Sequence, residues 1–119
     1  MESLEYLTKE KPETIKGCID FVIKNLNYKA PRVKWEASRV IAKICHKFPD
    51  KVANAIPGLL ENTKDRGTVV RWSAAFALTE IAKSNSELKE RLIPDINKIL
   101  NSETNNGVKK IYLNFLKGK

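Results

Sequence analysis

The chain has 119 residues, of which 42% are hydrophobic and 30% charged, so it fits one globular domain and not a disordered chain. Five glycines and five prolines are too few for a turn-dense all-β fold, and the two distant cysteines exclude a zinc or thioredoxin-type motif. The net charge of +8 comes from two segments: residues 29–51 hold seven basic and two acidic residues, and residues 105–119 hold four lysines and no acid.

Apolar residues recur at spacings of three and four along most of the chain, which is the period of one helix face. This pattern predicts an all-α fold of about seven antiparallel helices, at residues 2–10, 12–27, 31–47, 49–63, 68–84, 86–101 and 106–117. Pro12, Pro31 and Pro49 suit first-turn positions of helices. Thr68 and Ser86 are the predicted caps of the helices that follow them.

The helices form a repeat of about 37 residues. Trp35 and Trp72 lie 37 residues apart, and the apolar positions around them coincide at that offset. The chain then divides into a partial repeat (1–27), two repeats (31–63 and 68–101) and a last partial repeat (106–117). Pro57 and Pro94 fall at equivalent places inside the second helix of the two repeats, which predicts a shared bend there.

The segments Arg32–Ser38 and Val69–Leu78, the latter following Asp65, resemble the Asp-x-x-Val-Arg-x-x-Ala-x-x-Ala-Leu core of HEAT repeats, a family of armadillo-like and phycobilin-lyase-type helical proteins. The resemblance covers nearly the whole chain. It implies a right-handed α-solenoid (an α-α superhelix) whose second helices line the concave side, and whose repeats are linked by an Asp/Arg ladder. Here the ladder is represented by Asp65 and Arg71, with Lys34 in place of arginine in the earlier copy.

Members of this family generally bind proteins or peptides, so the expected function is a non-enzymatic interaction or scaffold module. The expected location is the cytoplasm, because the sequence shows neither a signal-peptide pattern nor a membrane-spanning run. The candidate binding residues lie off the apolar stripes of the second helices. They are Lys16, Asp20, Phe21, Lys24, Asn54, Gly58, Glu61, Arg91, Asp95 and Lys98. Phe21 stands out among them, because its repeat equivalents are Gly58 and Asp95 and no shared packing role requires an aromatic ring there.

An alternative function is electrostatic, weak binding of nucleic acid through a basic convex face. The residues of that face are Arg32, Trp35, Arg39, Lys43, Lys47, Lys109 and Lys110. The favoured interpretation of Trp35 and Trp72 is packing across the seam between adjacent hairpins, and the alternative is an exposed aromatic anchor or stacking platform.

No catalytic, cofactor or metal motif is present in the sequence. The one histidine, His46, follows a buried stripe, the glycines are isolated, and the acids are not clustered. No apolar run could span a membrane, and Cys18 and Cys45 are expected in the core. A further alternative is a piece of a longer solenoid that self-associates through its ends, where Leu4, Tyr6, Leu7, Ile111, Tyr112, Phe115 and Leu116 are expected to be exposed.

Overall fold

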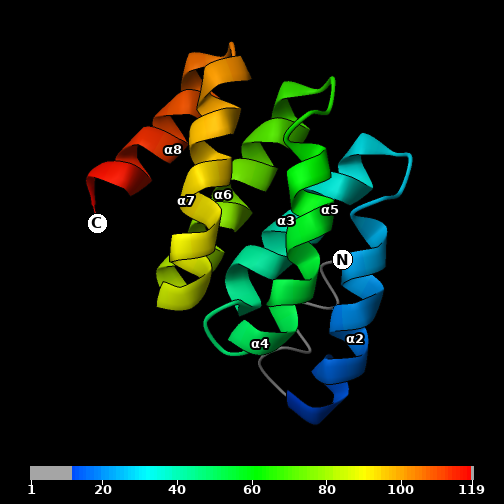
Figure 1. The fold of residues 1–119 in the computed structure, drawn as a ribbon. Helices are drawn as coiled ribbons and strands as arrows, with labels where there is room; N and C mark the ends of the chain where they lie inside the picture. The colour runs from blue at the N-terminus through cyan, green and yellow to red at the C-terminus, as the bar shows by residue number, and fades with distance from the viewer. Residues whose placement is uncertain (1–11, 119) are drawn as a thin grey trace.

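The structure is a computed structural model that describes residues 12–118, without the side chains of residues 12–18, 49 and 50. These residues form helices and no strand (Figure 1). In chain order they are α2 (Pro12–Asn25), α3 (Pro31–Ile44), α4 (Pro49–Val52), the short 3₁₀ helix η1 (Ala53–Ala55), α5 (Ile56–Asn62), α6 (Thr68–Ser84), α7 (Ser86–Ser102) and α8 (Asn106–Lys117). The predicted helix at 2–10, with Leu4, Tyr6 and Leu7, lies outside the described residues.

The starts of the helices follow local chemistry, in part as predicted. Pro12, Pro31 and Pro49 are the first residues of α2, α3 and α4, where the missing N–H costs no helix hydrogen bond. The predicted caps are wrong. The Oδ1 atom of Asn85 caps α7 by accepting hydrogen bonds from the amides of Glu87 (3.0 Å) and Leu88 (3.3 Å), and Gly67, without a side chain, precedes α6. Asn105 caps α8 in the same way.

The predicted helix at 49–63 is interrupted. It consists of α4, η1 and α5, with Pro57 as the second residue of α5, whereas α7 continues through Pro94. A proline removes one backbone hydrogen bond from the turn before it, and at Pro57 that turn is the 3₁₀ helix. The interruption is therefore not shared by the two copies.

The helices pack in two layers. α6 lies between α3 and α8 in one layer, while α2, α5 and α7 form the other layer, in front of it in Figure 1. We refer to the outward sides of these layers as the α3/α6/α8 face and the α2/α5/α7 face. The core between the layers consists of aliphatic side chains that are at most 1% exposed, among them Leu26, Ile41, Leu59, Leu78, Ile81 and Ile96.

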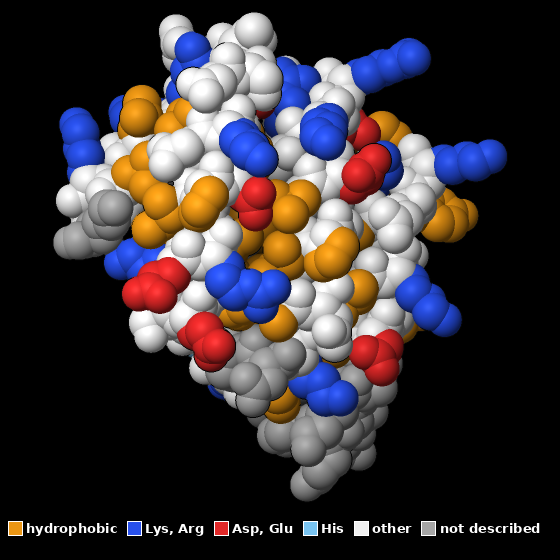
Figure 2. All heavy atoms as spheres, viewed as in Figure 1, with side chains coloured by type: hydrophobic (Ala, Val, Ile, Leu, Met, Phe, Trp, Pro, Cys, Tyr) orange, Lys and Arg blue, Asp and Glu red, His pale blue; other side chains and the backbone are white. Residues whose placement is uncertain are grey.

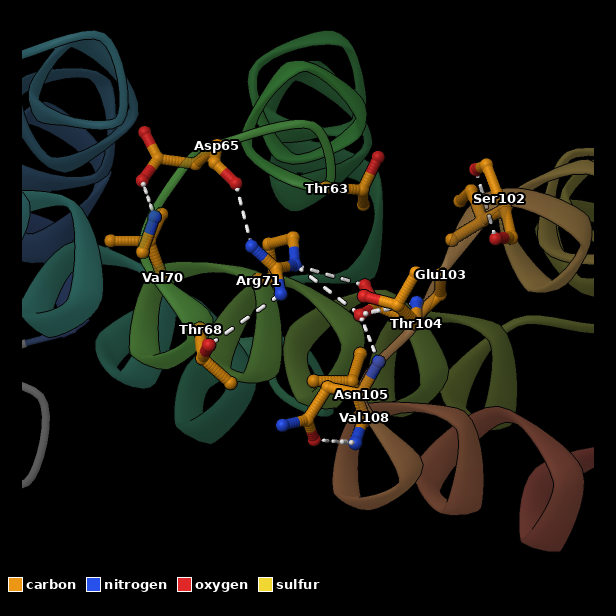
Figure 3. Close-up of polar contacts among 12 residues, drawn as sticks. Thr63, Asp65, Thr68, Val70, Arg71, Ser102, Glu103, Thr104, Asn105 and Val108 are labelled. Atoms are coloured by element: carbon orange, nitrogen blue, oxygen red, sulfur yellow. Dashed lines mark hydrogen bonds and ion pairs between the residues drawn. The ribbon is translucent and has the colours of Figure 1, made fainter.

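A chain of polar contacts, which we call the polar ladder, joins the amino ends of α3, α6 and α8. Figure 3 shows its part from Asp65 to Val108. The Lys34 ammonium of α3 lies 3.0 Å from Asp65 Oδ1 in the loop before α6, and Asp65 Oδ2 accepts the Gly67 amide at 2.9 Å. Arg71 of α6 donates to the backbone oxygens of Asp65 and Arg66 at 2.9 and 3.0 Å. The three amino ends are therefore side by side, so α3, α6 and α8 run parallel.

Glu103 is the link that sequence reasoning missed. Arg71 Nε donates to its carboxylate at 3.0 and 3.3 Å, and Glu103 Oε2 also accepts the amides of Thr104 and Asn105 at 3.1 and 2.9 Å. The Glu103 side chain is only 2% exposed. The buried carboxylate thus meets a guanidinium and two N–H donors, which offsets the cost of removing its charge from water.

The carboxyl end of the chain differs from the prediction. Tyr112 and Phe115, expected to be exposed, are 0% and 5% exposed because they turn into the core with Val108. Ile111 and Leu116 are partly buried, and Leu113, at 47%, is the most exposed apolar residue of α8. The apolar surface offered by this helix is smaller than the sequence pattern indicated.

Candidate interaction surfaces

A groove runs between α5 and α7 on the α2/α5/α7 face. Its volume is about 300 Å³. Its lining is Ala53, Ile56, Pro57, Leu60, Leu88, Arg91, Leu92 and Asp95. Figure 2 shows hydrophobic side chains gathered in the middle of this face, over α5 and α7, with basic and acidic side chains beside them. The groove is thus apolar along its floor and charged at the α7 rim.

The two charged residues of the rim come from one turn of α7. Arg91 and Asp95 are four residues apart, so their side chains emerge on the same side of the helix. Arg91 is exposed and Asp95 half-buried, and neither forms an ion pair or hydrogen bond with another described residue. A positive and a negative group are therefore available beside an apolar depression.

Most of the other predicted binding residues on the second helices are exposed but do not line this groove. Asp20, Phe21, Lys24, Asn54, Glu61 and Lys98 are exposed, Phe21 at 58%. The Lys16 side chain lies outside the described residues. Whether any of these residues contacts a partner stays a prediction.

Gly58 has a structural role that the sequence did not reveal. A Cβ atom at this position would lie 3.1 Å from Leu26 Cδ1, so the absence of a side chain lets α5 approach the end of α2 closely. At the same contact between the two helices, the buried Asn62 side chain donates a hydrogen bond to the Leu26 carbonyl oxygen at 3.1 Å. Gly58 therefore packs between helices, and whether it also contacts a partner stays a prediction.

The basic residues predicted for the convex side lie on the α3/α6/α8 face. Arg32, Arg39, Lys43, Lys47 and Lys110 are exposed, whereas Lys109 is half-buried. Each acid within α3 and α6 is paired with a base: Glu36 lies 3.3 Å from Arg32, and Glu80 lies 3.1 Å from Lys83 and 3.4 Å from His46. α8 has no acid.

The two tryptophans have different surroundings. Trp35 is partly buried, with the Arg39 guanidinium 5.2 Å from its ring centroid. Trp72 is 41% exposed, and its ring stacks on Phe76 of the same helix, with centroids 5.7 Å apart and planes 16° from parallel. The seam-packing interpretation is therefore wrong for Trp72, whose exposed ring stacks on a residue of its own helix.

The cysteine and histidine side chains that the structure describes lie in the core or on an exposed helix end, outside any cluster of potential metal ligands. Cys45 is a free thiol in the core, and burial raises its pKa to about 11. His46 is exposed at the end of α3 beside Glu80. Within residues 12–118 no three histidine, cysteine or acidic side chains gather as metal ligands, and no helix of that range has the length and apolar character to span a membrane.

The chain is similar in sequence to a subunit of a protein complex. The chain is 25% identical over 97 residues to AP-3 complex subunit delta-1 from Bos taurus. The match covers 82% of this chain but 8% of that protein. No family model and no solved structure matches the chain. The similarity, together with the all-helical structure, fits a helical-repeat family and identifies no specific protein.

Proposed function

We propose that the chain is a HEAT-like α-solenoid segment that acts as a non-enzymatic interaction module and binds a protein partner in the α5–α7 groove. Two layers of helices with parallel neighbours in one layer, and a polar ladder along their amino ends, support the solenoid interpretation. The relative AP-3 complex subunit delta-1 is, by its name, a subunit of a complex, which favours protein partners. A cytoplasmic location is part of the same proposal, since a free buried thiol suits a reducing compartment.

The observation that carries the proposal is the combination of an apolar groove with two charged residues that form no ion pair or hydrogen bond with the described residues. Apolar burial supplies affinity for an inserted side chain, because about 25 cal/mol is gained for each Å² removed from water. Charges at the rim select orientation, since a mismatched charge would be left desolvated. The expected ligand is a protein segment with an apolar anchor flanked by an acidic group for Arg91 and a basic group for Asp95.

The test exchanges the signs at the rim without changing the net charge. The double variant Arg91→Glu, Asp95→Lys should lose partners that the wild-type chain captures from native lysate, as measured by quantitative mass spectrometry. The matched control is Lys64→Glu with Glu90→Lys, because both residues are exposed and outside the groove lining. Partners that are lost with the rim variant and kept by the control support the proposal. If the rim variant keeps every captured partner, the groove is not the binding site.

A further inference from the structure

The α3/α6/α8 face carries an exposed aromatic strip that has no role in the core. Val69, Trp72 and Phe76 are 59%, 41% and 38% exposed and lie at intervals of three and four along α6. They therefore share the outermost side of the helix at the centre of this layer. Packing does not require large apolar groups here, because the core side of α6 is occupied by nine other residues, from Val70 to Ala82, that are buried.

Basic residues flank this strip from both neighbouring helices. α3 packs along one side of α6 and α8 along the other, and the ladder shows that all three run parallel. Arg32, Trp35 and Arg39 of α3 are the repeat equivalents of Val69, Trp72 and Phe76 of α6. Because the two helices pack in parallel, we infer that the two sets lie on the same outward side of this layer. On the other side, α8 presents Lys110 and Lys117. Since neighbouring helix axes lie about 8–10 Å apart, the charges stand within a side chain's reach of the rings.

The exposed charge on this face has one sign. The acids of α3 and α6 are already paired, Glu36 with Arg32 and Glu80 with Lys83 and His46, and α8 contributes none. A surface of this kind attracts polyanions. The aromatic rings between the basic residues narrow the class of polyanion that fits this surface. A polyanion with exposed flat rings gains stacking on the aromatic side chains as well as charge neutralisation.

We propose that the Val69–Trp72–Phe76 strip and its flanking basic residues bind single-stranded nucleic acid without sequence preference. Nucleobases would stack on Trp72 and Phe76, and phosphates would contact Arg39 and Lys110. An acidic protein segment would satisfy the charges but offers no regular series of π-faces. A duplex offers phosphates, but its bases are stacked on each other and closed to Trp72. This face is opposite the α5–α7 groove, so the proposal does not depend on the groove and can fail separately from it.

The first measurement is fluorescence anisotropy of a fluorescein-labelled oligothymidylate of about a dozen residues, a length within the usual footprint of such surfaces. Trp72→Leu keeps an apolar helix former at an exposed position but removes the stacking ring. It should weaken binding of the oligonucleotide roughly tenfold and leave duplex binding unchanged. Circular dichroism and thermal unfolding of the variant confirm that the fold is kept.

The second measurement is the salt dependence. Arg39→Gln with Lys110→Gln should lower the slope of log affinity against log salt by about 0.7 for each charge removed. Lys24→Gln with Lys98→Gln is the matched control, because both lysines are exposed on α2 and α7 and the net charge falls equally; its slope should stay unchanged. Equal binding by Trp72→Leu and wild type, or equal competition by polyglutamate at the same charge concentration, would overturn the proposal.

Discussion

At the scale of single residues, the Glu103 carboxylate accepts hydrogen bonds from three residues, Arg71, Thr104 and Asn105. It holds Arg71 of α6 and the two amides that precede α8. The HEAT pattern indicated Asp65 and Arg71 but not this residue. The ladder acid of the last copy is a glutamate, and it lies 38 residues after Asp65 instead of 37, so neither residue type nor offset identified it.

Glu103→Gln should lower the free energy of unfolding by about 2–3 kcal/mol, because it leaves the partly buried Arg71 without a counter-charge. Urea unfolding followed by circular dichroism measures this loss. Glu61→Gln is the control, since Glu61 is exposed and forms no ion pair with a described residue; it should change stability by less than about 0.5 kcal/mol. A loss in Glu103→Gln no larger than in the control would show that the buried pair contributes nothing.

Asp65 gives the ladder a pH dependence. Burial by itself would raise its pKa, but the Gly67 amide, the Lys34 ammonium and the charge of Arg71 outweigh burial and lower the pKa below its ordinary value. The unfolded chain therefore binds the proton more readily. The stabilisation is present above the unfolded pKa of about 3.9 and is lost as the pH falls through the lower folded value.

Asp65→Asn keeps an oxygen for the Gly67 amide but removes the charge that holds Lys34. At pH 7 this variant should be less stable than wild type by on the order of 1–2 kcal/mol. The difference should shrink as the pH falls below about 4, because the wild-type carboxylate then becomes neutral. Thermal unfolding of both proteins between pH 7 and pH 3 measures it. A stability difference that stays constant over this range would contradict the assignment.

At the scale of elements, composition and spacing predicted most helices well, and the failures have physical causes. The bounds of α2, α3, α6, α7 and α8 lie within three residues of those predicted, because apolar spacing and first-turn prolines act through the backbone alone. The predicted helix at 49–63 is interrupted by η1 before Pro57, and the close approach of α5 to α2 at Gly58 and Leu26 was not predicted. That approach is a tertiary contact, which no local signal contains.

The cap of α7 distinguishes two adjacent residues that look equally suitable in the sequence. Asn85 has extended backbone geometry and accepts the amides of Glu87 and Leu88, whereas Ser86 is the first residue of the helix. Asn85→Ala should therefore cost about 1 kcal/mol in unfolding free energy, and Ser86→Ala should be nearly neutral. Chemical denaturation of the two variants tests the assignment directly. Equal losses, or a larger loss for Ser86→Ala, would contradict it.

At the scale of the whole molecule, the sequence predicted the separation of charge but not the groove. The basic residues of α3 and α8 were found from their spacing alone, because exposed positions on a helix follow its period. The α5–α7 groove depends on the distance between two helices that are not consecutive. Only Arg91 and Asp95 of its lining were among the predicted residues, and both were selected for lying off the apolar stripes of the second helices.

Packing between neighbouring helices should give the chain unequal local stability. α6 contacts α3, α5, α7 and α8 and has nine buried residues, whereas α8 contacts α6 and α7 and has three. A helix with few buried residues can unfold locally while a more deeply buried helix remains folded. Amide hydrogen exchange, corrected for intrinsic rates, should therefore be at least about tenfold slower in the middle of α6 than in the middle of α8, a difference of about 1.4 kcal/mol in opening free energy. Glu103→Gln should widen this gap, because it loosens the link between α6 and α8 without touching the α3–α6 contact. Equal protection of α6 and α8 would instead show that the described helices unfold as one cooperative unit.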